Sequence, residues 1–203
     1  MDTDAFALKY VNGQWIRHHD RVIDSELDKE FAIKQNPAFL CPEEIILCQE
    51  VIVVMYHAFD GMIHQGQIVI HEELVEDIRF VFEVILEEKF PITSVIPIAD
   101  PKFHWDDELS MLANNSSGFN YRTIARTDKL SNHALGRAVD INPRLNPYIR
   151  GDFIQPKNTI YDVKKPGTIT MDSVIVSCFK ERGWTWGGDW IDRKDYQHFE
   201  KSV

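Results

Sequence analysis

Hydrophobic positions along the chain follow two patterns, β-branched runs and stripes at helical spacing. The run EVIVVMYHAF, residues 50–59, is rich in β-branched and aromatic side chains, which is typical of a strand. The run QGQIVIH, residues 65–71, predicts the partner strand of an antiparallel hairpin whose loop is longer than two residues. Residues 72–90 carry apolar side chains at helical spacing and stop before Pro91. This helix is expected to pack one face on the hairpin.

Shorter segments complete the predicted fold. The pattern predicts strands over 92–98 and 136–142, short helices within 24–37 and 105–113, and a helix over 170–183. Thr170 is the expected N-cap of that last helix, and Gly183 suits its C-terminal end. The Pro- and Asn-rich residues 142–158 predict a long loop, and a strand-like pair around a Gly-Gly turn is expected after 183.

Length and composition favour one soluble-type globular domain. The chain has 203 residues, of which 44% are hydrophobic and 27% charged, so it can bury a core. The expected class is α+β, a small single domain with a central antiparallel sheet and flanking helices. Residues 1–45 are interpreted as an N-terminal lead-in and residues 46–203 as the functional domain.

Charge and cysteine usage exclude several function classes. A formal charge of −10 without a Lys/Arg cluster argues against a nucleic-acid partner. We expect no transmembrane segment, because no run reaches the ~18 apolar residues that span a bilayer, and the opening MDTDAFALKY lacks the features of a signal peptide. Cys41, Cys48 and Cys178 are expected to be plain thiols, with a Cys41–Cys48 bridge as the alternative.

The stretch SNHALGRAVDI, residues 131–141, places charged side chains in an otherwise apolar run. Alternation along a strand puts Val139 and Ile141 on one face and Asp140 on the other, where it can enter a cleft. Gly136 permits a bend that brings His133, seven positions earlier (140 − 133 = 7), back toward Asp140.

A second group of polar residues lies in DRKDYQHFE, residues 192–200. Alternation places His198 and Glu200 on one side of a strand and Phe199 on the other. His133, Asp140 and His198 then form a set of three ligands with a fourth position open, which is the pattern of catalytic zinc. His57, His64 and His71 are interpreted as structural or exposed instead.

Two further residues suit hydrolysis at such a metal. Zinc lowers the pKa of a water in the open position to about 7. Asp195, three residues before His198, is the expected general base, and Arg122 could stabilise an oxyanion or bind a substrate carboxylate. From spacing alone, a satisfied structural histidine and a buried, paired aspartate remain the alternative interpretation.

The two stretches together resemble the D-alanyl-D-alanine carboxypeptidase-like family of zinc peptidases. The pattern S-x-H-x-x-x-G-x-A-x-D is followed by carboxylate-x-x-H, in that order, and NNSSGFNYR resembles the segment that carries an upstream arginine. The likeness spans roughly residues 50–200. It implies a hedgehog/DD-peptidase-like fold and peptidoglycan stem peptides as substrate, expected in the cell wall or periplasm.

The resemblance also implies a role for each matching residue. It puts Zn²⁺ on His133, Asp140 and His198. It makes Asp195 the general base and Arg122 the arginine that contacts substrate or the transition state. It adds Ser131, beside the first ligand, as a residue that contacts substrate.

Two questions stay open at the level of sequence. An Asp at position 195, where carboxypeptidases and dipeptidases of the family often have Glu, is similar to the L-alanyl-D-glutamate endopeptidase branch, so the bond cut is not fixed. The alternative function is a zinc-containing, non-catalytic binding module of the same fold, similar to the hedgehog signalling domain. The retained Asp195 and Arg122 favour the enzyme. Oligomeric state cannot be inferred from these patterns.

Overall fold

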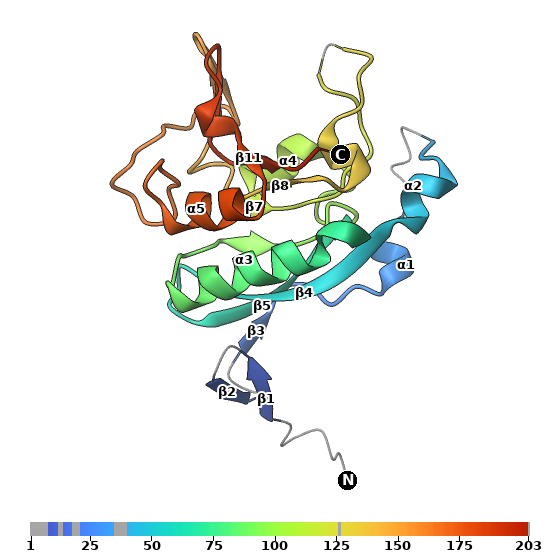
Figure 1. The fold of residues 1–203 in the computed structure, drawn as a ribbon, viewed down its shortest axis with the longest axis vertical. Coiled ribbons are helices and arrows are strands. Elements are labelled where there is room, and N and C mark those ends of the chain that lie inside the picture. The colour runs from blue at the N-terminus through green and yellow to red at the C-terminus, as the bar shows by residue number, and fades with distance from the viewer. Residues whose placement is uncertain (1–7, 12–13, 18–20, 35–39, 126, 203) are drawn as a thin grey trace.

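The structure is a computed structural model that describes residues 8–11, 14–17, 21–34, 40–125 and 127–202. It confirms a small mixed α+β chain in which helices are few and the sheets are short. Figure 1 shows a lower part built on a long hairpin and an upper part that contains the C-terminal half.

The described helices and strands are short, with the hairpin and one helix as exceptions. The α-helices are α1 (Lys29–Ala32), α2 (Glu43–Leu47), α3 (Val75–Glu87), α4 (Asp107–Leu112) and α5 (Val174–Glu181). The 3-10 turns are η2 (Glu72–Leu74), η3 (Asn132–Leu135) and η4 (Gly187–Asp189). The strands are β1 (Leu8–Val11), β2 (Gln14–Arg17), β3 (Arg21–Ile23), β4 (Gln49–His57), β5 (Ile63–His71), β6 (Ser94–Val95), β7 (Asn115–Ser116), β8 (Ala138–Asp140), β9 (Tyr148–Arg150), β10 (Phe153–Gln155), β11 (Thr185–Trp186), β12 (Lys194–Asp195) and β13 (His198–Glu200).

The hairpin β4–β5 and helix α3 form the base of the core, as predicted. The two strands pair antiparallel from Gln49↔His71 to His57↔Ile63. Helix α3 lies along one face of the hairpin, and α5 lies above α3 (Figure 1). Ile78 and Ile85 of α3 are fully buried in this cluster, together with residues of β4, β5 and α5. Burying each such side chain contributes about 1.5–3 kcal/mol, so this layer is the main stabilising unit.

The opposite face of the hairpin is covered by residues from the N-terminal part. Val69 of β5 packs with Ala32, Ile33 and Cys41 in a second cluster. Strand β3 also pairs with β5, in parallel. Residues on both sides of position 45 therefore share one cluster, and the boundary between a lead-in and a functional domain stays a prediction.

The single central antiparallel sheet that the sequence suggested is replaced by five short sheets in the described residues. The hairpin sheet has the order β3-β5-β4, and two others have the orders β11-β13-β8 and β10-β9-β12. The pairs β1–β2 and β6–β7 complete the set. The strand expected over 92–98 is reduced to β6, because Pro91 and Pro97 on either side lack the N–H that a ladder requires.

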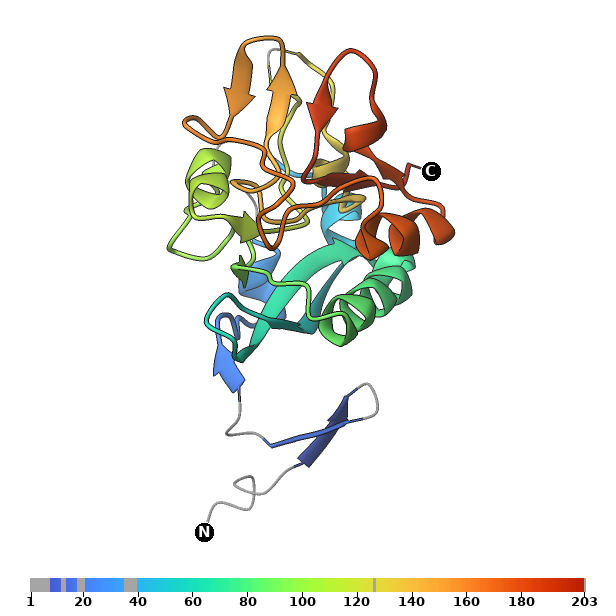
Figure 2. The same ribbon diagram turned by 90° about the vertical axis from the view of Figure 1, so that its left-hand side faces the viewer.

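The long loop predicted over 142–158 is wrong in its middle part. Strands β9 and β10 form an antiparallel hairpin there, and β12 pairs with the other edge of β9. Figure 2 shows this hairpin at the end of the molecule remote from the N-terminus. Gly151, with φ of 57°, takes the left-handed conformation that the tight connection requires. The Pro and Asn residues lie mainly before and after the hairpin, so composition alone hid it.

Helix α5 begins three residues later than predicted. Ser173, not Thr170, is its N-cap residue, and the Thr170 N–H donates to the Ser173 hydroxyl at 2.8 Å. The expectation for the other end is confirmed, since Gly183 follows the C-cap residue with φ of 80°.

The cysteines agree with the expectation of plain thiols. Cys41, Cys48 and Cys178 are free thiols, and Cys178 is buried in the main core. Burial raises the pKa of the Cys178 thiol to about 11. Within the described part of the chain, every helix is too short or too polar to cross a lipid bilayer.

Candidate metal centre

Asp140 and His198 are brought together by strand pairing. In the antiparallel pair β8–β13, His198 lies directly opposite Asp140, and Phe199 lies opposite Val139. Directly opposed side chains on one face of such a pair are about 4.5–5.5 Å apart at their Cβ atoms. The His198 Nδ1 atom consequently lies 3.0 Å from Asp140 Oδ1. On the other face, Phe199 is fully buried and stacks on Phe179 with ring centroids 4.0 Å apart.

His133 reaches the same point from the 3-10 turn η3. Ser131 is the N-cap residue of this turn, and its hydroxyl accepts a hydrogen bond from the His133 N–H at 3.3 Å. The turn ends at Gly136, whose φ of 64° confirms the predicted bend. A Cβ atom there would lie 1.9 Å from Gln49 Oε1, so only glycine fits against the end of the hairpin. The turn is thereby fixed both by its cap and by the hairpin.

The orientation of the His133 ring is set by the segment of residues 117–119. Residue 117 pairs with Asp140 through two backbone hydrogen bonds, and the Phe119 N–H donates to Val69 of β5. This holds the Gly118 carbonyl oxygen 2.7 Å from His133 Nδ1. A carbonyl only accepts, so Nδ1 carries the proton and Nε2 presents a lone pair.

The His198 ring is oriented from its opposite side by a carboxylate. His198 Nε2 lies 3.0 Å from Glu200 Oε2, and the same oxygen accepts from Asn132 Nδ2 at 2.6 Å. With a proton on Nε2 for Glu200, the His198 Nδ1 atom presents a lone pair toward Asp140. Sequence reasoning placed Glu200 on the face of His198 but assigned it no role, and it gave Asn132 none.

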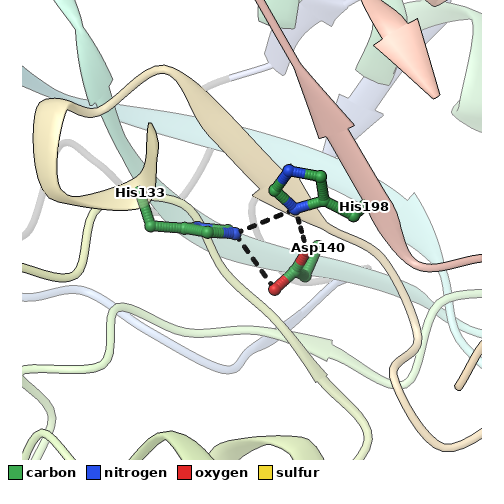
Figure 3. A group of neighbouring side chains, drawn as sticks. All are labelled: His133, Asp140 and His198. Carbon is green, nitrogen blue, oxygen red and sulfur yellow. Dashed lines mark hydrogen bonds and ion pairs between the residues drawn. The ribbon is translucent and has the colours of Figure 1, made fainter. Parts of the chain in front are cut away.

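Three lone-pair atoms of buried residues therefore converge on one point (Figure 3). His133 Nε2 lies 3.2 Å from His198 Nδ1 and 3.2 Å from Asp140 Oδ2. Ligand atoms at 2.0–2.1 Å from a tetrahedral zinc are roughly 3.3 Å apart. Two imidazole nitrogens and a carboxylate oxygen at this separation repel one another unless protons or a cation lie between them. The three residues form a group that could hold a metal ion.

The pKa shifts of Asp140 and His198 also indicate that this site favours a positive charge. Burial by itself raises the pKa of Asp140, but the adjacent His133 and His198 outweigh it and hold that pKa far below its usual range. Burial lowers the pKa of His198, yet hydrogen bonds to Asp140 and Glu200 outweigh this and raise it to about 10. Both shifts have one cause, the close approach of a carboxylate and two imidazoles, and this arrangement favours a positive charge at the point where they meet.

Asp195 lies on β12, next to this group. Burial raises the pKa of its carboxyl to about 6, with the charges of His198 lowering it and that of Asp140 raising it. Gln197 Nε2 donates to Asp195 Oδ1 at 3.2 Å. A Cβ atom on Gly187 would lie 2.6 Å from the Asp195 carbonyl oxygen, so the Gly-Gly turn lets β12 approach closely. A carboxyl with a pKa near the working pH is suited to accept a proton.

Arg122 and Ser131 lie on the segments that flank His133. The Ser131 N–H donates to the Arg122 carbonyl oxygen at 3.1 Å. The Arg122 guanidinium forms an ion pair with Asp107 of α4 at 3.0 Å, while its buried Nε meets no acceptor among the described residues. The structure records no direct contact between the Arg122 side chain and the three converging residues in the described chain. Roles in substrate binding for Arg122 and Ser131 stay predictions.

The histidines interpreted as structural or exposed lie away from this centre. His64 is buried between two aspartates, and its ring nitrogens lie 2.9 Å from Asp24 and 3.0 Å from Asp60. His71 caps η2 by accepting from the Glu73 N–H at 3.2 Å. His57 ends β4 and is partly buried.

The comparison with protein families adds an independent observation. The sequence profile of the family described as D-alanyl-D-alanine carboxypeptidase matches residues 125–201. The resemblance is confirmed over this segment. The match covers η3, β8 and β13, and so includes His133, Asp140, Asp195 and His198. It supports a peptidase. No curated protein and no solved structure matches the chain.

Proposed function

We propose that the chain is a zinc peptidase that hydrolyses peptidoglycan stem peptides, with a hedgehog/DD-peptidase-like fold. The observation that carries the proposal is the convergence of His133 Nε2, His198 Nδ1 and Asp140 within a segment that matches a carboxypeptidase family. The donor set has two imidazoles and one carboxylate, which suits catalytic zinc with a position left for substrate. No thiol belongs to the group, which distinguishes it from common structural zinc sites.

Each protein residue has a separate task in this proposal. When bound, zinc would supply Lewis-acid chemistry, polarising the scissile carbonyl and acidifying water. Asp195 accepts the proton of the attacking water and returns it to the leaving amine, for which its raised pKa of about 6 is suited. Gln197 orients the Asp195 carboxylate by donating to one of its oxygens. Asp195 therefore serves as general base for water and as general acid for the leaving amine, and the proposal needs no separate general acid.

Arg122 is the proposed partner of negative charge on the substrate. Its ion pair with Asp107 holds the guanidinium in place, and a partly exposed side chain leaves it accessible to a carboxylate or an oxyanion. Ser131 lies beside His133 and can present its hydroxyl proton to substrate while its oxygen accepts from the His133 N–H.

Hydrolysis of purified muropeptides by the zinc-loaded chain tests the proposal. We expect Asp195→Asn to keep zinc and to lower kcat by about 10²–10⁴-fold, because a general base contributes that much. Asp192→Asn is the matched control, since Asp192 lies in the same stretch but pairs with Arg193 at the surface. Wild-type activity should persist in that control.

The product masses identify the bond cut. Released D-alanine would indicate a carboxypeptidase, whereas an internal cut between L-alanine and D-glutamate would indicate an endopeptidase. A chain that holds zinc but cleaves no muropeptide, with Asp195→Asn indistinguishable from wild type, would show that the proposed activity is wrong.

A further inference from the structure

Glu200 and Asn132 form a polar pair behind His198 that the proposed activity does not use. Glu200 Oε2 accepts from His198 Nε2 at 3.0 Å and from Asn132 Nδ2 at 2.6 Å. The Glu200 side chain is 24% exposed, so the carboxylate is partly buried.

The two partners of Glu200 come from the two segments that carry the histidines. Asn132 directly precedes His133 in η3, whereas Glu200 follows His198 by two residues on β13. Their contact joins positions 68 apart in sequence. The same carboxylate therefore orients one imidazole and ties the turn that holds the other imidazole to the strand.

We propose that Glu200, held by Asn132, is a positioning residue that fixes His198 in the tautomer with its proton on Nε2. A neutral imidazole has one protonated nitrogen, and Nδ1 can donate its lone pair to a metal only when the proton is on Nε2. An acceptor at Nε2 secures this arrangement and increases the basicity of Nδ1. His133 has the corresponding partner in the Gly118 carbonyl, bonded to Nδ1, so its Nε2 is the nitrogen that would bind a metal.

The two histidines therefore present different nitrogens to the proposed metal, Nε2 of His133 and Nδ1 of His198. The hydrogen bonds to their other nitrogens also differ in strength. A carboxylate forms a charge-assisted hydrogen bond, which is roughly twice as strong as one to a neutral carbonyl. The negative charge on Glu200 would also neutralise part of the 2+ charge of a bound zinc ion, of which Asp140 alone among the three ligands neutralises a share. This inference rests on the proposed zinc site.

Zinc affinity, measured by competition with a chromophoric chelator, tests the pair. We expect Glu200→Ala to weaken zinc binding by about 10–100-fold, as loss of an outer-shell partner does. Glu200→Gln keeps an acceptor at the same place without the charge and should recover part of the loss. Asn132→Ala should have a smaller effect in the same direction, because the carboxylate stays but is less fixed.

A second measurement separates positioning from general support of the fold. Nitrogen-15 NMR of the histidine rings in the zinc-loaded protein should show His198 protonated on Nε2 in wild type and in Glu200→Gln. In Glu200→Ala, the Nε2 proton should exchange faster with solvent. Glu50→Ala is the control, because Glu50 is a strand carboxylate bonded to Lys29 at 2.6 Å and should leave zinc affinity unchanged.

The outcomes distinguish this inference from the proposed function. Absence of zinc binding by the wild-type chain would overturn both. Normal zinc binding and peptide cleavage, with Glu200→Ala equal to wild type in affinity and in the His198 proton signal, would overturn the role of Glu200 alone. Should Glu200→Ala fail to fold, unchanged affinity in both Glu200→Gln and Asn132→Ala would equally overturn that role.

Discussion

Within the described residues, a comparison of two clusters that combine histidine with carboxylate shows opposite geometry. In the first, named here the convergent cluster, His133, Asp140 and His198 direct their lone-pair atoms to one point. In the second, the divergent cluster, His64 lies between Asp24 and Asp60, with one ring nitrogen bonded to each.

The directions of the ring nitrogens decide what each cluster can do. The two ring nitrogens of His64 bond carboxylates on opposite sides of the ring, so they point to separate partners and not to one shared position for an ion. In the convergent cluster, the outer nitrogens are used by Gly118 and Glu200, which leaves the inner ones facing each other. The same residue types thus give an ion pair in one place and a candidate metal site in the other.

The position of each cluster fits this difference. The divergent cluster joins the N-terminal part to the hairpin, because Asp24 follows β3 and His64 lies on β5. Tyr56 of β4 donates to the same Asp24 carboxylate and accepts from the Val95 N–H. These contacts hold segments in place, whereas the three residues of the convergent cluster lie within the segment that matches the carboxypeptidase family.

The largest expected effect comes from removing a residue of the convergent cluster. His133→Ala should abolish peptide cleavage and weaken zinc binding by more than the roughly 100-fold that loss of an outer-shell partner costs. His64→Ala should retain zinc, since His64 contributes nothing to the converging atoms. Metal content after dialysis would report both, and loss of zinc from His64→Ala would contradict the distinction.

A smaller effect, on stability, is expected from the divergent cluster. His64→Ala leaves the Asp24 carboxylate with fewer donors in a partly buried place, and we expect a loss of about 1–3 kcal/mol in the free energy of unfolding. Urea denaturation of the zinc-saturated protein would measure it. His57→Ala, at the end of the same strand pair, serves as the comparison and should cost less.

The smallest effect is a pH dependence of that stability. Burial lowers the pKa of His64, but the hydrogen bonds to Asp24 and Asp60 outweigh it and raise the pKa above 6.5. The stabilisation is therefore fully present below about pH 6.5, where the unfolded chain is also protonated, and is lost as pH rises through the folded-state pKa. Among the described residues, the ionisable groups that contact the ring are Asp24, Asp60 and Tyr56.

Denaturation of the zinc-saturated protein between pH 6 and 9 would reveal this trend, because a metal bound at the convergent cluster would prevent His133 and His198 from titrating. His64→Gln should remove it. A trend of equal size in His64→Gln would assign the pH dependence to other groups.

Much of this arrangement is predictable from sequence, and the failures have physical causes. Alternation along residues 138–142 and 198–200 correctly separates Asp140 and His198 from Val139 and Phe199, because a buried strand face constrains every second residue. The β9–β10 hairpin was missed because its flanks are rich in Pro and Asn. A usable signal was present, since Tyr148-Ile149 and Phe153-Ile154 flank a turn that contains Gly151.

Partners that act through backbone or distant side chains were beyond the sequence. The Gly118 carbonyl carries no sequence signature, and backbone contacts of its neighbours, residue 117 with Asp140 and Phe119 with Val69, place it near His133. Asn132 and Glu200 meet across 68 positions, which no local pattern reveals. The hydrogen bonds from the two ring nitrogens of His64 to Asp24 and Asp60 likewise depend on the fold, although the sequence favoured a structural or exposed position for His64.

The pairing of β8 with β13 has one further consequence. Sliding β13 by a single residue would turn His198 into the aromatic stack around Phe179 and direct Phe199 at Asp140. Such a shift would destabilise both faces of the strand, because it would bury the His198 imidazole among aromatic rings and place the Phe199 ring beside the Asp140 carboxylate. A larger or smaller side chain at Phe179 would therefore shift β13 and alter the position of His198. The affinity for a cation at the convergent cluster would then change, although residue 179 does not belong to that cluster.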